Sequence, residues 1–118
     1  MEVFHYTAVE ASPVQEEGAS GVTIRWVLDE RKGANNFAMR VFDLEPGGYT
    51  PRHAHPWEHE VFILEGRGQV WGNGGWHEFG PGSVVFVPPG EEHQFKNTGS
   101  EQVKLICLVP REGCPACR

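Results

Sequence analysis

Short apolar stretches alternate with tight-turn residues along the whole chain. The longer stretches are predicted to be strands, at residues 22–30, 36–45, 60–66, 83–90 and 102–110. Residues 22–30 alternate between apolar and polar, as does a strand with one buried face. Residues 60–66 and 83–90 are nearly continuously apolar instead, which favours strands that are buried deeply.

Shorter elements complete an all-β pattern. Further strands are predicted at residues 3–7, 68–72, 76–80 and 93–97, a loop at 11–20, and turns at 31–36, 46–48 and 97–101. The dipeptide Asn73-Gly74 is typical of a two-residue hairpin turn. No stretch of twelve or more residues has a helical period. With 15 glycines and 9 prolines in 118 residues, the pattern predicts an antiparallel sandwich or barrel of the jelly-roll kind.

Composition narrows the class of protein. A chain of 118 residues is expected to form one domain. The net charge of -6 without a basic run argues against nucleic acid or an anionic membrane as a partner. No apolar run approaches the roughly 20 residues that span a bilayer, and no secretory signal is visible, so the cytoplasm is the expected location. The three cysteines do not suggest a disulfide framework.

The densest chemistry lies in the stretch HAHPWEHE, residues 53–60, which holds three of the six histidines. Neutral imidazole is the commonest metal ligand among side chains. On an extended strand His53 and His55 point to the same face, and His59 has the same parity, although Pro56 must bend the chain between them. This clustering predicts a metal site. His5 and His77 stand apart and are predicted not to take part.

Two blocks of sequence resemble the two signature motifs of the cupin superfamily. The blocks read Gly47-x5-His53-x-His55-x3-His59-x6-Gly66 and Gly82-x5-Pro88-x-Gly90-x2-His93-x3-Asn97. Together they cover residues 47–97. The resemblance implies a cupin-type double-stranded β-helix. The glycines of both blocks are expected to supply turns with positive φ, and Asn97 is expected to brace a loop through its side chain.

The first block departs from the usual motif at one ligand. Cupins commonly have a glutamate there, whereas this chain has His59, with Glu60 next to it. Strand parity favours His59, unless a bulge turns Glu60 inward in its place. The resemblance therefore implies a small single-domain cupin of the four-histidine variety, with the ligand set His53, His55, His59 and His93.

The ligand type limits the metal and the chemistry. Imidazole nitrogens suit one divalent transition metal ion per chain, and we expect manganese or iron, with nickel, cobalt, copper and zinc as further possibilities. Four ligands leave coordination positions open for a substrate. A dioxygenase-type oxidoreductase acting on a small organic, possibly anionic, substrate is the first hypothesis. The alternatives are a redox-neutral isomerase or lyase, and a non-catalytic module that binds a small molecule or the metal.

Three residues are candidates for contact with the substrate. Cys107 lies on the predicted inner face of residues 102–110. Arg40 would need an anionic partner if its face is interior, but both faces of its strand are apolar, so the sequence leaves this open. Tyr49 and Trp57 are predicted to wall the entrance. No general base is evident near the histidines, which favours oxygen chemistry or binding over isomerisation.

The domain is placed at residues 1–110, followed by a tail at 111–118. The tail holds Cys114 and Cys117 in a CxxC arrangement without a second pair. This pair has two possible functions: it is half of a zinc site, or it forms a reversible disulfide. The third possibility is a reduced tail without a role. Small cupins commonly form homodimers, and the apolar character of both faces in residues 36–42 and 60–64 also favours a homodimer here.

Overall fold

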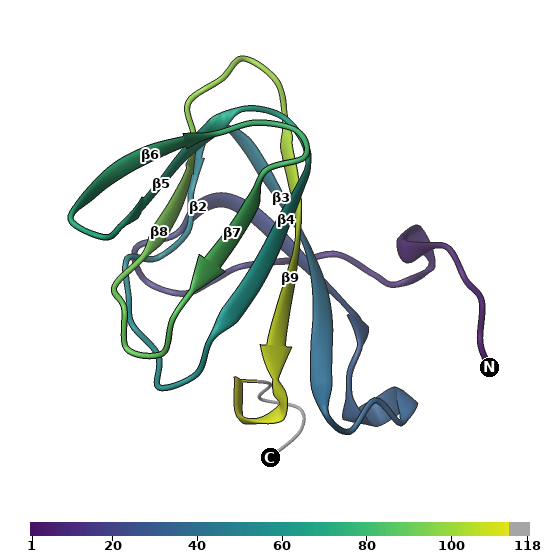
Figure 1. The fold of residues 1–118 in the computed structure, drawn as a ribbon. Coiled ribbons are helices and arrows are strands. Elements are labelled where there is room, and N and C mark those ends of the chain that lie inside the picture. Colours follow the sequence, from purple (N-terminus) through teal and green to yellow (C-terminus); the bar gives the residue numbers. More distant parts are fainter. Residues whose placement is uncertain (114–118) are drawn as a thin grey trace.

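The computed structural model describes residues 1–113 and consists of one curled antiparallel sheet (Figure 1). Its strands are β1 (Ser12–Pro13), β2 (Ser20–Leu28), β3 (Phe37–Tyr49), β4 (His59–Glu65), β5 (Gly68–Gly72), β6 (Gly75–Phe79), β7 (Val84–Val87), β8 (Gln94–Asn97) and β9 (Val103–Pro110). Three single-turn 3₁₀ helices, η1 (Tyr6–Ala8), η2 (Glu30–Lys32) and η3 (Arg111–Gly113), lie between and after them. In this part of the chain no helix is long and apolar enough to cross a membrane.

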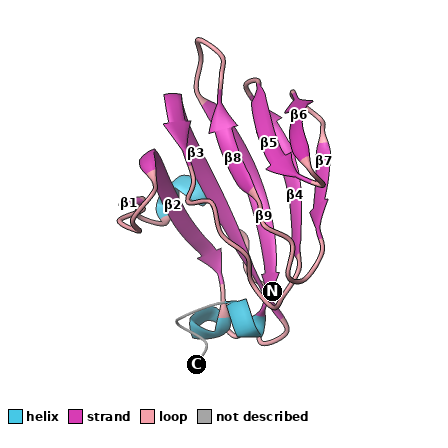
Figure 2. Cartoon of the chain, turned by 90° about the vertical axis from the view of Figure 1, so that its left-hand side faces the viewer, coloured by secondary structure: helices cyan, strands magenta, loops and turns pink. Residues whose placement is uncertain are grey.

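The long strand β3 connects the two halves of the sheet. Strand order is β6-β5-β8-β3-β9-β4-β7, and β2 also pairs with β3. The first part of β3 pairs with β2 and β9, whereas its last residue, Tyr49, pairs with Ser20 of β2 and with Lys96 of β8. The strands lie side by side in Figure 2, and the curl of the sheet is clearest in Figure 1. The predicted jelly-roll architecture is confirmed.

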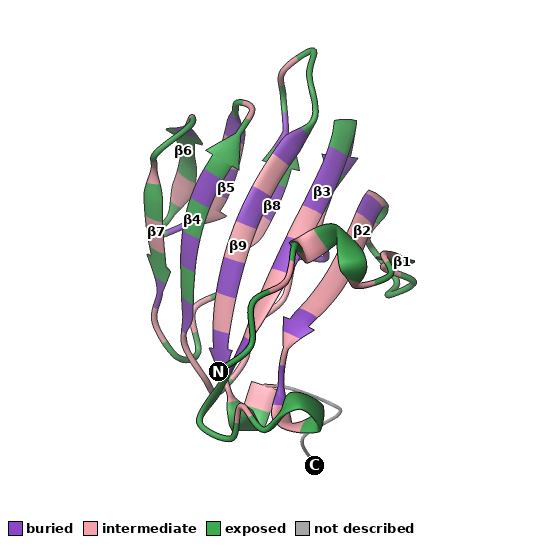
Figure 3. Cartoon of the chain, turned by 90° about the vertical axis from the view of Figure 1, so that its right-hand side faces the viewer, coloured by how far each residue is buried: buried purple, intermediate pink, exposed green. Residues whose placement is uncertain are grey.

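The core lies inside this curl. Burial alternates along β4 and β9, as the bands in Figure 3 show. The predicted inner face of β9 is confirmed, because Val103, Leu105, Cys107 and Val109 are all buried. They pack with Val22, Ala38, Leu44, Val61, Ile63, Val70, Phe79 and Phe95 in one cluster. Residues of β5, β6 and β8 thus share one core cluster with residues of β4 and β9.

Three predicted elements are wrong. The loop predicted at residues 11–20 contains the two-residue strand β1, which pairs with β2. Residues 3–7 do not form a strand; instead, the side chain of His5 accepts a hydrogen bond from the Thr7 N–H at the start of η1. Residues 46–48 do not end β3. They form a bulge inside it: Ser20 and Val22 of β2, two residues apart, pair with Tyr49 and Leu44 of β3, which are five residues apart. Gly47 has a φ of 81° in this bulge. Pairing with β2 holds this turn-like sequence within the strand.

Local predictions at the turns are confirmed. Asn73 and Gly74 have φ values of 49° and 79°, as a type I′ hairpin turn requires. Asn97 is 1% exposed and does brace a loop. Its amide donates to the carbonyl oxygens of Leu44 at 3.0 Å and Glu101 at 2.8 Å, and it accepts from the Gly99 N–H at 2.9 Å. The tail cysteines Cys114 and Cys117 lie outside the described residues.

Candidate metal centre

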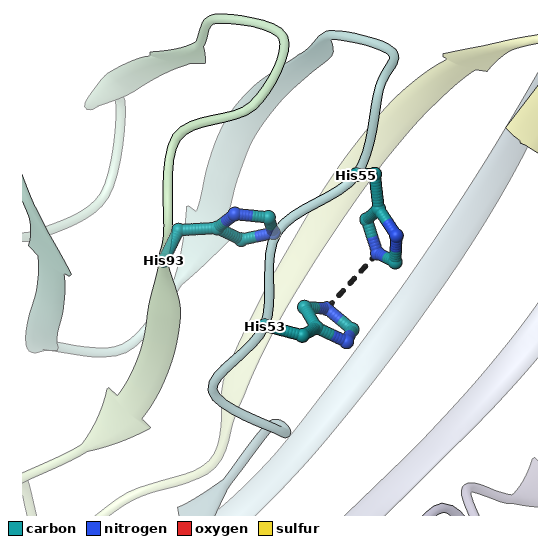
Figure 4. A group of neighbouring side chains, drawn as sticks. All are labelled: His53, His55 and His93. Carbon is teal, nitrogen blue, oxygen red and sulfur yellow. Dashed lines mark hydrogen bonds between the residues drawn. The ribbon is translucent and has the colours of Figure 1, made fainter.

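Three separate segments bring the histidines together at one end of the barrel. His53 follows β3, and its backbone forms a two-way bridge with that of His93, with N···O distances of 3.2 and 3.0 Å. His55 is two residues further along, and His59 is the first residue of β4. Figure 4 shows the rings of His53, His55 and His93 converging from the two bridged segments. The bridge therefore fixes the relative positions of both motifs.

The geometry of three of these rings fits a metal ion. The Nε2 atoms of His53 and His55 are 3.1 Å apart, and one nitrogen from each of His53, His55 and His93 lies within 4.8 Å of the others. Two or more lone pairs pointing at each other at this distance are unfavourable unless a proton or a cation lies between them. These three residues can therefore hold a metal ion.

His59 lies next to this group. Its ring centroid is 5.4 Å from that of His55 and 4.9 Å from that of His93. Its Nε2 is buried and has no hydrogen-bond partner within residues 1–113. An orphaned buried nitrogen is costly in a protein, and a cation shared with the neighbouring rings would remove that cost. The three grouped histidines thus fit a metal ion, and His59 is a candidate for a fourth ligand beside them.

Glu60, the fallback ligand, faces away from this site. Pairing of β4 with β7 and β9 is regular through Glu60, so no bulge changes the parity there. His59 is buried, whereas Glu60 is exposed and shares a hydrogen bond with Glu58 that raises its pKa. The orientation predicted from strand parity is thus confirmed.

Burial keeps the four rings neutral. Desolvation is the main cause that lowers the pKa of each ring, to about 4 for His55 and about 3 for His59. For His59 the positive charge of Arg40 is the next cause. At neutral pH every ring therefore has one nitrogen with a free lone pair, which is the form that binds metals.

Groups around the rings hold the outward-facing Nδ1 atoms. His93 Nδ1 is 2.9 Å from the carbonyl oxygen of Glu91, to which it donates. His53 Nδ1 is 3.5 Å from a carboxylate oxygen of Glu16. Such partners orient metal-binding histidines and fix their tautomers. Glu16 was not predicted from the sequence, because it lies in a polar loop without a motif. Only tertiary packing brings it next to His53.

A cavity of about 460 Å³ opens beside the histidines. Its walls are mainly apolar, formed by Val14, Ile24, Trp26, Phe42, Pro51, Trp57, Val61, Phe95 and Leu105, with Gln15, Glu16, Arg40, Thr50, Cys107, Gly113 and the four histidines as the remainder. Trp57 stacks on the ring of His55 at 4.7 Å. Of the three candidate residues, Arg40 and Cys107 line the cavity. Tyr49 does not, because it points outward from β3 while the next residue, Thr50, faces in.

Arg40 is a cation without an anionic partner. Its Nη2 is 2.8 Å from Cys107 Sγ, and its guanidinium lies over the rings of Trp26 and Phe42. Among residues 1–113 no carboxylate forms an ion pair with it, and its Nε is buried without a hydrogen bond. The question that the sequence left open is thus answered: the face of β3 that carries Arg40 is interior.

Comparison with known proteins gives relatives with several activities. The polyketide cyclase RemF from Streptomyces resistomycificus is 37% identical, with a TM-score of 0.87 over 93% of this chain and 79% of that one. The 1-methylthio-D-xylulose 5-phosphate methylsulfurylase of Rhodospirillum rubrum is 30% identical over 92% of this chain and 70% of its own length. The glucose-6-phosphate isomerase of Thermococcus kodakarensis is 33% identical, but this chain spans only 51% of its length.

The family assignment follows from the match to a family model and from these relatives. The model described as a cupin domain matches residues 40–109, which is more than half of the chain. This range includes all four clustered histidines and both glycine-rich blocks. The chain therefore belongs to the cupin family.

Proposed function

We propose that this protein is a metal-dependent enzyme that acts, without net oxidation, on an anionic and largely apolar carbonyl compound. The observation that carries the proposal is the charge of the cavity. Arg40 lies there without a carboxylate partner among residues 1–113, beside four uncharged imidazoles. Arg40 is partly buried, and a desolvated cation without a counter-charge is unfavourable, so an anionic ligand is the complementary occupant of the cavity.

The histidines His53, His55, His59 and His93 are proposed to hold one divalent transition metal, manganese or iron. When bound, such an ion supplies Lewis acidity toward a carbonyl oxygen. Arg40 is proposed to bind and orient the anionic group of the substrate, a carboxylate or an enolate, by two parallel hydrogen bonds. The aromatic walls, including Trp57, exclude water and so strengthen that interaction.

Glu16 is proposed as the residue that moves a proton. The sequence alone favours oxygen chemistry, because no general base is evident in it beside the histidines. In the structure the Glu16 carboxylate lines the mouth of the cavity, 3.5 Å from His53 Nδ1. Glu16 is 64% exposed at the cavity wall, and we propose that it accepts a proton from a carbon acid bound there. This supports a redox-neutral reaction over the dioxygenase hypothesis.

The relatives support the same choice, and the cavity favours one of them. A cyclase and an isomerase are both named for rearrangements of their substrates, and RemF is the more similar in sequence. A sugar phosphate would need many polar partners, whereas the walls here are mainly apolar and have one unpaired cation. We therefore propose a β-dicarbonyl chain of the polyketide type as the substrate class.

The test is exchange of the acidic α-protons of β-diketones and β-keto acids in D₂O. Manganese-loaded protein is expected to accelerate deuterium uptake, followed by NMR, without consuming oxygen. Arg40→Met should slow exchange in the keto acids by about 10- to 100-fold, since hydrogen bonds to charged groups contribute about 1.5–3 kcal/mol. Arg52→Met is the matched control, because Arg52 pairs with Glu92 outside the cavity. Oxygen uptake is measured with both manganese-loaded and iron-loaded protein. Uptake that is coupled to substrate loss would support the dioxygenase hypothesis instead.

We also propose that the protein forms a homodimer through the outer face of its sheet. Cross-strand register places Ile106, Phe62 and Val84 in one row across β9, β4 and β7, next to Val41 of β3, which this chain itself already buries. Phe62 is 44% exposed and Val84 72%. A contiguous apolar row on a strand face is typical of an interface, and two copies related by a twofold axis would cover each other's row.

Sedimentation velocity tests this assembly. The wild-type chain of 13.2 kDa is expected to sediment as a dimer at micromolar concentration, and Phe62→Asp as a monomer, because a charge would be buried in the interface. Trp76→Asp serves as the control, since Trp76 is similarly exposed (40%) on the β5–β6 hairpin. A monomeric wild type, or a dimeric Phe62→Asp, would contradict the proposal.

A further inference from the structure

The Nδ1 atom of His59 has two neighbours that decide what its Nε2 can do. Arg40 Nη2 is 3.3 Å from this Nδ1, and Cys107 Sγ is 3.5 Å from it. On the other side of the ring, Nε2 is buried without a hydrogen-bond partner in the described chain and lies among the other histidines. The position of the single proton of this neutral ring therefore matters.

Only one of the two tautomers leaves Nε2 free to bind a metal. If Nδ1 accepts a hydrogen bond from Arg40, the proton is on Nε2, which then has no lone pair to offer. If the proton is on Nδ1, it needs an acceptor. A guanidinium only donates hydrogen bonds, so of the two neighbours only the Cys107 sulfur can accept it.

The surroundings of Cys107 suit this role without any change of charge. Arg40 Nη2 donates to the sulfur at 2.8 Å, and the thiol itself is directed at the backbone carbonyl of Leu108 at 3.9 Å. A neutral thiol can thus donate its proton to Leu108 while its sulfur accepts from Arg40 and His59. The residue is buried, so water does not compete for these contacts.

We infer that Cys107 is a positioning residue for the metal centre: its sulfur accepts the Nδ1–H of His59 and so keeps the tautomer whose Nε2 faces the metal. This inference rests on the metal site proposed above. Metal-binding histidines usually donate to a carboxylate or a carbonyl oxygen, as His93 does to Glu91. At His59 a cysteine takes that place, and Arg40 is the competing neighbour that favours the other tautomer.

Zinc affinity, measured by competition with a chelating dye, tests the inference. Cys107→Val removes the acceptor at little change in volume and should weaken zinc binding by about 10- to 100-fold, the range for lost partners of metal ligands. Cys107→Ser keeps an acceptor and should stay near the wild-type affinity. Melting of the metal-free variants shows whether each is folded, and Cys107→Ala replaces Cys107→Val if the latter is not.

Two further readouts separate this role from simple packing. In ¹⁵N NMR of the metal-free proteins, His59 should be protonated at Nδ1 in the wild type and at Nε2 in Cys107→Val, a change that packing alone does not predict. The double variant Arg40→Met, Cys107→Val should recover part of the zinc affinity that Cys107→Val loses, because the Nδ1–H no longer faces a guanidinium N–H. Loss of the Arg40 charge by itself also favours binding of a cation, so the gain from Arg40→Met is compared in the Cys107→Val and wild-type backgrounds. The inference predicts a larger gain in Cys107→Val, whereas packing alone predicts equal gains.

The outcomes that overturn the inference are distinct from failure of the metal site. If Cys107→Val binds zinc as tightly as the wild type, or if Cys107→Ser and Cys107→Val lose affinity equally, Cys107 does not set the tautomer. If the wild type itself binds no zinc and no other transition metal, the metal site proposed above fails, and this inference fails with it.

Discussion

Replacing His53 and His93 together by alanine is expected to yield a folded protein that carries no transition metal, whereas the wild type should carry roughly one ion per chain. Zinc bound by four protein ligands contributes about 10–16 kcal/mol, so each ligand accounts for roughly 3 kcal/mol. Loss of two ligands should therefore weaken binding by about four orders of magnitude. Elemental analysis of the purified proteins and dye competition measure this.

Two single variants are the controls for this result. His77→Ala removes a histidine that lies on β6 and bonds the Gly72 carbonyl instead of facing the cavity. Glu60→Ala removes the exposed fallback ligand. Both should bind metal like the wild type. A wild type without metal after growth in manganese, iron and zinc would contradict the proposed metal site. Loss of metal in Glu60→Ala would instead favour the ligand set in which Glu60 replaces His59.

Gly66→Ala is expected to lower the stability of the fold strongly. Gly66 has a φ of 86°, and a Cβ there would lie 2.5 Å from the Gln102 carbonyl oxygen and 2.7 Å from Val103 Cα. Both neighbours are backbone atoms that cannot rotate away. The left-handed conformation costs about 1–2 kcal/mol and the overlap about 1–3 kcal/mol more. Urea denaturation should show a loss of about 2–5 kcal/mol in the free energy of unfolding.

Gly82→Ala is the matched control for this variant. Gly82 has the same φ of 86° and is likewise a motif glycine, but a Cβ there would meet nothing within 4 Å. Its replacement should cost only the conformational part, about 1–2 kcal/mol. If both variants lose the same free energy of unfolding, the close approach of residue 66 to Val103 does not affect stability.

These two glycines also show what a local sequence pattern can predict about the structure and what it cannot. The turn chemistry of the sequence predicts positive φ at both, because glycine alone adopts it without steric cost. Which of them is pressed against another strand depends on β9, whose residues are far away in the sequence. The same holds for residues 46–48, where proline and glycine predict a turn but pairing with β2 produces a bulge within β3.

The sequence by itself determined most of the strands, the family resemblance and the inward orientation of residue 59 rather than residue 60. These follow from periods of two and from motif spacing, which are properties of neighbouring residues. The tertiary structure alone decided that Arg40 faces the cavity, that Tyr49 does not, and that Cys107 and Glu16 lie against the histidines. Both faces of β3 are apolar, so only pairing with β9, which puts Cys107 opposite Arg40, fixes which face is interior. Contacts between such distant residues depend on how the sheet curls, and no local pattern encodes that curl.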